Sequence, residues 1–319
     1  MPRLLAGLIV AAMLAVVPAQ PAMAAPPLEW GIDVKPGQAN MDSIESAVGR
    51  KAASTRVFLK WNSPFPDTYH NYLGVNGHTL MISVRPQYLN GAKILWKDLA
   101  RPGTRSYTEL LSWVEKIKAF QASYPDSSVT FTLHHEPETV ANSVFGTAAD
   151  YTAAWVRVVQ EFRNRAVNVK FYWIMTAHSF RRPLADRQNA ANWYPGDSYV
   201  DVIASDAYNW YTCRHDVSSP WKSLVSLIKP MRDFGAARSK AMYLTEYASV
   251  EDPQVPGRKA QWLSDAQALF KTPEYALFTG VAYFNLNGPN YPACGWPVTS
   301  SDSALAAFRT MGLDPAYAG

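Results

Sequence analysis

Two glutamates follow short apolar runs that are typical of buried β-strands. Glu136 comes directly after the run 129–135, and Glu246 closes the run 241–245. A carboxylate at the mouth of a buried strand is costly to desolvate, so it is retained mainly where chemistry or an ion pair uses it. Cleavage of a glycosidic bond needs two carboxyl groups, one protonated to help the leaving oxygen depart and one ionised. The two glutamates are therefore a candidate acid/base and nucleophile.

Short apolar runs and amphipathic stretches alternate along the chain and would position these carboxylates. This alternation predicts a parallel sheet covered by helices, and eight such units predict closure into a (β/α)8 TIM barrel of the α/β class. A doubly wound open sheet is the alternative, but the first run is not followed by a glycine-rich phosphate loop. The expected strands are 30–34, 55–59, 79–84, 129–133, 169–174, 200–204, 241–244 and 280–284.

Two helix starts carry capping signals. Ser106 with Glu109 and Thr147 with Asp150 have the spacing of a capping box, in which each side chain bonds the other residue's backbone N–H. We expect helices to begin at both places.

The first 24 residues have the pattern of a secretory signal. Arg3 precedes an uncharged apolar stretch over 4–17, and Ala22-Met-Ala24 is a small-residue cleavage site. We expect residues 1–24 to be removed and residues 25–319 to form one secreted, extracellular catalytic domain. In an oxidising compartment Cys213 and Cys294 could form a disulfide, although the sequence does not establish that they meet.

The composition limits the expected kinds of partner. The chain has 11 Trp and 17 Tyr with only 18% charged residues, which suits a wall of aromatic rings facing a ligand. Its formal charge of +4 is scattered, so nucleic acid is not an expected partner. No membrane contact after signal cleavage, no cofactor and no metal are expected, and a monomer is the default.

In a barrel of this kind the active site lies at the carboxyl ends of the strands. Both glutamates fall there, with several polar and aromatic candidates. Arg85 is the expected cation beside Glu246, with a structural ion pair as its alternative. Asp33 and Asp206 could bind sugar hydroxyls or cap turns, and His178 could line the cleft. The tryptophans that could stack on sugar rings or pack in the core are Trp61, Trp193, Trp210 and Trp296.

Three segments resemble the clan A retaining glycoside hydrolases, and family 26 in particular. They are His134-His-Glu-Pro-Glu138, the stretch 194–210 through the sixth strand, and Leu244-Thr-Glu-Tyr247. The resemblance implies that Glu136 is the general acid/base and Glu246 the nucleophile. It also implies that His135 binds the reacting sugar and that Tyr208 hydrogen-bonds the nucleophile.

That family is known chiefly for endo-β-1,4-mannanases, so the resemblance implies a secreted endo-glycosidase acting on β-mannan. The chain departs from the clan pattern at Tyr283-Phe-Asn285, where a tryptophan is usual, and over 137–142, where the usual aromatic-rich segment is absent. The alternatives are the same mechanism on β-1,3-xylan or mixed-linkage β-glucan, and a non-catalytic glycan-binding protein on the barrel scaffold.

Overall fold

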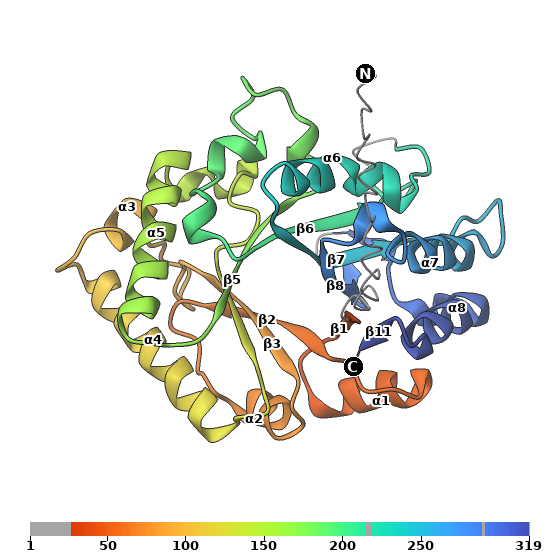
Figure 1. Cartoon of the computed structure of the whole chain (residues 1–319), viewed down its shortest axis with the longest axis horizontal. Helices are drawn as coiled ribbons and strands as arrows, with labels where there is room; N and C mark the ends of the chain where they lie inside the picture. The colour runs from red at the N-terminus through yellow and green to blue at the C-terminus, as the bar shows by residue number, and fades with distance from the viewer. Residues whose placement is uncertain (1–26, 215–218, 289–290, 319) are drawn as a thin grey trace, which may run out of the picture.

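The computed structural model describes residues 27–214, 219–288 and 291–318. Eight parallel strands form a closed barrel, because β1 pairs with both β2 and β8 (Figure 1). The predicted (β/α)8 barrel is confirmed. Its strands are β1 (Leu28–Asp33), β2 (Ser54–Lys60), β3 (Thr79–Arg85), β4 (Val129–Leu133), β5 (Lys170–Thr176), β6 (Val202–Asn209), β7 (Ala241–Ser249) and β8 (Phe278–Phe284).

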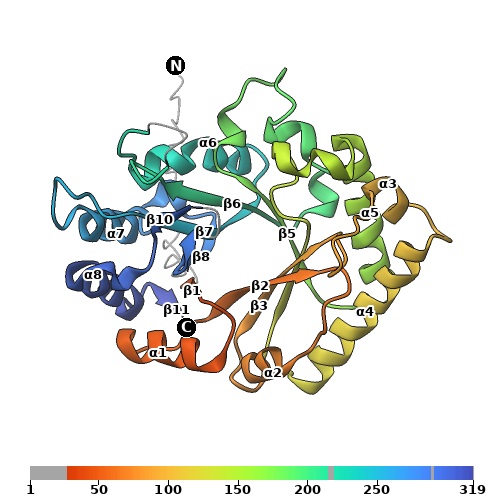
Figure 2. The same cartoon turned by 180° about the vertical axis from the view of Figure 1, so that it is seen from behind.

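Helices surround the barrel in both views (Figures 1 and 2). They bury apolar stripes against the sheet, as α5 does with Trp155, Val158, Val159 and Phe162. The α-helices are α1 (Gln38–Val48), α2 (Thr68–Val75), α3 (Trp96–Leu99), α4 (Arg105–Ser123), α5 (Ala148–Asn164), α6 (Leu224–Ala236), α7 (Arg258–Leu269) and α8 (Asp302–Leu313). Two short strands, β9 (Asn287–Gly288) and β10 (Tyr291–Gly295), pair after β8, and β11 (Tyr317–Ala318) lies beside β1.

One predicted cap is confirmed and the other is wrong. Thr147 and Asp150 form the expected capping box at the start of α5. At α4, however, the N-cap is Thr104, whose side chain accepts a hydrogen bond from the backbone of the third helical residue. Glu109 does not cap this helix, because its carboxylate accepts hydrogen bonds from Trp61, Tyr88 and Arg105 instead.

Packed side chains fill the barrel interior at the end where the strands begin. A cluster separate from the main core contains Met81, Tyr172, Ile174, Val202, Ala204, Tyr243 and Ala282. Tyr243 fits because β8 carries Gly280 opposite its ring, where an added Cβ would lie 2.4 Å from the ring edge. The barrel is therefore closed near the strand starts, and an open cleft can form only at the carboxyl ends.

A disulfide joins Cys213 to Cys294, which confirms the pairing considered from the sequence. It links the loop after β6 to β10, which follows β8. The expected signal segment 1–24 lies outside the described residues. Within the described ranges, no helix has both the length and the apolar character required to cross a membrane.

Candidate active site

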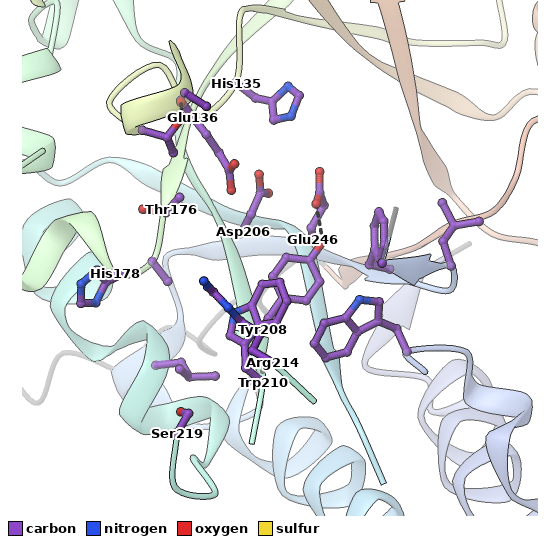
Figure 3. Close-up of a pocket in the computed structure, with 18 of the residues that line it drawn as sticks. His135, Glu136, Thr176, His178, Asp206, Tyr208, Trp210, Arg214, Ser219 and Glu246 are labelled. Atoms are coloured by element: carbon purple, nitrogen blue, oxygen red, sulfur yellow. Dashed lines mark hydrogen bonds between the residues drawn. The ribbon is translucent and has the colours of Figure 1, made fainter. Parts of the chain in front are cut away.

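A cavity of about 1420 Å³ opens at the carboxyl ends of the strands (Figure 3). Seven of the eight predicted catalytic and substrate-binding residues line it, namely His135, Glu136, Asp206, Tyr208, Trp210, Glu246 and Trp296. Thr176 and His178, at the end of β5 and just beyond it, also face the cavity. The sequence therefore located the cleft and most of its functional side chains.

The backbone after β4 directs the side chains of the adjacent His134 and His135 to different places. His134 and Glu136 adopt left-handed conformations, with φ of 52° and 50°. Such conformations are uncommon for non-glycine residues, and they concentrate at functional sites. The His134 ring is buried against Phe145, with 4.6 Å between ring centroids. His135 instead faces the cavity beside Phe58, so the two histidines do not share a ligand.

Glu246 is held by two donors at the end of β7. Tyr208 donates a short hydrogen bond to its Oε2, as the resemblance implied (Figure 3). The Arg56 Nη2 lies 3.2 Å from its Oε1, and both side chains are buried. Burial raises the pKa of Glu246, while Arg56 and Tyr208 act in the opposite direction by stabilising the anion. The arrangement favours an ionised Glu246.

The expectation that Arg85 would be the cation at Glu246 is wrong. Arg85 lies at the last position of β3, where its guanidinium donates to Asn142 and stands 5.2 Å from the centre of the Phe145 ring. Arg56 occupies the middle of β2, deep enough to reach Glu246 across the barrel. A charged residue inside the apolar run 55–59 was the sequence signal that could have identified it.

Glu136 has the opposite electrostatic environment. Burial raises its pKa well above the usual value, and Asp206, Glu246 and Glu138 add to the increase as like charges. Arg56 opposes them only in part. In Figure 3 the carboxyl groups of Glu136, Asp206 and Glu246 converge on the same part of the cavity. A carboxyl group in such a place can keep its proton near neutral pH, as a general acid must.

The two candidate aspartates have different positions. Asp206 lines the cavity, and its Oδ1 accepts a hydrogen bond of 2.7 Å from Thr245. Asp33 does not line it, since its side chain is buried below the cavity and accepts a 2.7 Å hydrogen bond from the backbone of Arg56. Of the alternatives considered for Asp33, the structure does not support binding of a sugar, and the side chain instead holds the strand that carries Arg56.

Aromatic rings form one wall of the cavity. Tyr208 packs against Trp296, Trp210 and Phe284, with ring centroids 4.9, 5.5 and 5.6 Å apart. Phe284 stands at the end of β8, where the clan pattern has a tryptophan. The backbone carbonyl of Trp296 accepts a 2.9 Å hydrogen bond from the buried ammonium of Lys259. The Lys259 ammonium therefore holds this part of the wall in place.

Two other tryptophans are core residues. Trp61 and Trp193 are buried and do not line the cavity, so of the two alternatives considered for them, stacking on sugars or packing in the core, the structure supports the core. The sequence analysis also missed Phe58, which is 44% exposed and forms part of the cavity wall on β2. Within the described residues, no group of three or more His, Cys, Asp or Glu could hold a metal ion.

Comparison with known proteins agrees with this geometry. The family model described as glycosyl hydrolase family 26 matches residues 112–243, which include Glu136 and Asp206. The chain is also 25% identical over 290 residues to Endoglucanase H of Acetivibrio thermocellus. The chain is therefore similar to glycosyl hydrolase family 26 over a segment that makes up less than half of its length. The match covers 87% of this chain but only 29% of Endoglucanase H.

Solved structures share the fold of this chain. A family 26 protein, GH26C from Muricauda sp. MAR_2010_75, has a TM-score of 0.62 at 16% identity, over 92% of this chain and 87% of that one. A β-mannanase from a symbiotic protist of the termite Reticulitermes speratus, solved with a gluco-manno-oligosaccharide, has a TM-score of 0.59 at 14% identity. The match covers 92% of this chain and 88% of the mannanase. At these identities the likeness concerns the fold.

Proposed function

We propose that this protein is a secreted endo-glycosidase that hydrolyses a β-linked polysaccharide with net retention. The observation that carries the proposal is the pair of carboxyl groups in opposite environments, with Glu246 bound by Arg56 and Tyr208 and Glu136 surrounded by like charges. Two such groups on one cavity are what double displacement needs. The (β/α)8 family 26 relatives support the same chemistry.

In the proposed mechanism, Glu246 attacks the anomeric carbon while Glu136 gives its proton to the leaving glycosidic oxygen. This step breaks the glycosidic bond and forms a glycosyl ester on Glu246. A water molecule then gives a proton to Glu136 and attacks the ester, which regenerates both carboxyl groups. Tyr208 and Arg56 stabilise Glu246 as an anion before attack and as a leaving group in the second step.

β-1,4-Mannan is the first substrate to test, since the solved relatives include a β-mannanase and the GH26 domain of a Prevotella bryantii endo-β-mannanase/endo-β-glucanase. Mixed-linkage β-glucan is a second candidate, which the similarity to Endoglucanase H favours. β-1,3-Xylan belongs in the same substrate panel. Reducing-sugar release from soluble glucomannan by the protein without residues 1–24 is the direct assay, and the first anomer formed, followed by NMR, reports retention.

Variants separate the two roles. Glu246→Ala should abolish hydrolysis of every substrate. Glu136→Ala should lose most activity on the polysaccharide but much less on an aryl glycoside with a good leaving group, which needs little acid assistance. Glu109→Gln is the matched control, because Glu109 does not line the cavity and its carboxylate accepts hydrogen bonds from Trp61, Tyr88 and Arg105. It should show no such dependence on the leaving group.

Full hydrolysis by Glu246→Ala would refute the assignment of the nucleophile. Tight glycan binding by the unmodified protein without hydrolysis over long incubation would instead favour the non-catalytic binding protein.

A further inference from the structure

The charged side chains that line the described part of the cleft divide into two groups. The acidic ones, Glu136, Asp206 and Glu246, all belong to the catalytic centre at the ends of β4, β6 and β7. All other charged lining residues are basic. They come from the loops after β1, β5 and β6, and they are Lys35, Arg181, Arg182, Arg214 and Lys222.

The two arginines of the loop after β5 that line the cavity are fixed in different ways. Arg182 forms an ion pair with Asp186 at 2.6 Å. Arg181 donates to the backbone carbonyls of Ser226 and Leu227 in α6, at 2.7 and 2.8 Å. Among the described residues, no carboxylate lies within ion-pair distance of Arg181. The position of its guanidinium is therefore fixed by backbone carbonyls of α6.

Lys222, in the loop after β6, has its backbone held by hydrogen bonds on both sides. Its backbone N–H donates to Asn209 at 3.0 Å, and its carbonyl accepts from Trp262 at 3.0 Å. No carboxylate of the described chain forms an ion pair with Lys222, and the same holds for Lys35 across the cleft. Arg214 stands over the Trp210 ring, 5.0 Å from its centre, and adds a further cation to this region.

The pKa of His178 responds to several of these charges together. It lines the cavity from the loop after β5 (Figure 3). Burial lowers its pKa, and Arg182, Arg181 and Lys222 lower it further, with Asp186 opposing them. The cations of two different loops therefore act on one point of the cleft wall.

A concave wall with low-dielectric surroundings strengthens the field of such cations. Among the described residues, Arg181 and Lys222 form no ion pair with a carboxylate, so their charges repel one another unless a ligand offsets them. A neutral glycan would leave this repulsion in place, whereas an anionic group would relieve it. We propose that the substrate of this cleft is an anionic β-glycan, whose carboxylates or sulfate esters bind against the wall formed by Arg181, Lys222 and their neighbours after β5 and β6. This inference rests on the proposed glycosidase function and specifies its substrate class.

The test compares three polymers with one backbone. They are glucomannan, glucomannan partly oxidised at C6 to carboxylates, and sulfated glucomannan. We expect kcat/KM to be higher on at least one charged polymer than on the neutral one and the difference to shrink with added salt. A preference for the oxidised polymer would identify uronate carboxylates, and a preference for the sulfated one would identify sulfate esters. Hydrolysis without any preference for charge would overturn the inference.

Lys222→Gln should lower kcat/KM on the preferred charged polymer about three- to fivefold more than on the neutral one, as expected for one partly exposed charge pair. Lys51→Gln is the matched control. It removes the same charge from an exposed position before β2, at the barrel end remote from the cleft, and should leave the ratio unchanged. Equal losses on both polymers for Lys222→Gln would argue against the proposed contact.

Measurements of polymer binding test the substrate class independently of catalysis. The retardation of Glu246→Ala by each polymer in affinity electrophoresis should show the same preference for charge. If no polymer is hydrolysed but a charged one still binds more tightly, the catalytic proposal fails and the substrate class stands. If a charged polymer neither binds more tightly nor is cleaved faster, the substrate class is refuted.

Discussion

Replacing Arg56 with Met should destabilise the protein in a way that depends on pH. Arg56 is fully buried, and it lowers the pKa values of Glu246, Asp206 and Asp33 together. Methionine would keep part of the side-chain volume but leave these carboxyl groups without their buried counter-ion. Breaking a buried ion pair from one side costs about 3–5 kcal/mol. We expect a loss of about this size in the free energy of unfolding in mildly alkaline solution.

The sign of the pH dependence follows from the direction of the pKa shifts. Without Arg56, the native-state pKa values of these carboxyl groups rise further above their unfolded-state values. A carboxyl group with a raised native pKa favours the folded state at low pH, and that contribution disappears as the pH rises through the native pKa. The free energy of unfolding of the variant should therefore be close to that of the native protein at about pH 5 and lower than it at about pH 8.

Urea unfolding at several pH values measures this difference. Arg85→Met is the matched control, because Arg85 ends the neighbouring strand, contacts Asn142 and Phe145, and forms no ion pair with a carboxylate in the described part of the chain. It should lose about 1–2 kcal/mol at every pH, as expected for one hydrogen bond and some packing. A loss in Arg56→Met that is equally independent of pH would refute the assignment of Arg56 as the counter-ion of the site.

Further predictions concern the catalytic pair and the disulfide. The kcat/KM profile should be bell-shaped, with activity lost below the pKa of Glu246 and above that of Glu136, and both limbs should lie above the usual carboxyl range. An alkaline limb that survives in Glu136→Ala would contradict this assignment. Tyr208→Phe removes a hydrogen bond to the Glu246 anion, so the acid limb should move to higher pH, and an unmoved limb would exclude this role. The double variant Cys213→Ser with Cys294→Ser opens a cross-link between residues 81 apart and should lose about 4 kcal/mol in thermal unfolding, whereas no loss would mean that the unfolded chain is not constrained by the bond.

The fold was predictable because its signal is periodic and repeated. Eight apolar runs separated by amphipathic stretches allow few closed arrangements, and the observed strands fall on all eight runs. The barrel topology then brings the strand ends together, which explains why Glu136 and Glu246 could be paired from the sequence. The disulfide was anticipated only as a pairing of the two available cysteines.

The predictions that failed concern side chains whose contacts depend on how deeply they lie within the barrel. Arg56 and Arg85 both belong to strands that border the site, but the mid-strand Arg56 reaches Glu246, whereas Arg85 at the strand end contacts Asn142 and Phe145. Trp61 and Trp193 follow strands in the sequence, yet both are buried. Sequence order gives the end of the barrel at which a side chain lies, but not whether it points inward.

The pairing of β11 with β1 has a consequence for engineering. Leu28 donates its backbone N–H to Ala316 at 2.8 Å, so the first and last strands of the described chain meet side by side, as Figures 1 and 2 both show. This meeting point is at the start of β1, on the face of the barrel opposite the cleft. A short linker could join the two strands and new ends could be opened in a surface loop, which would make the chain a natural candidate for circular permutation. A reporter domain or surface anchor attached there would leave the cleft accessible to long polymers.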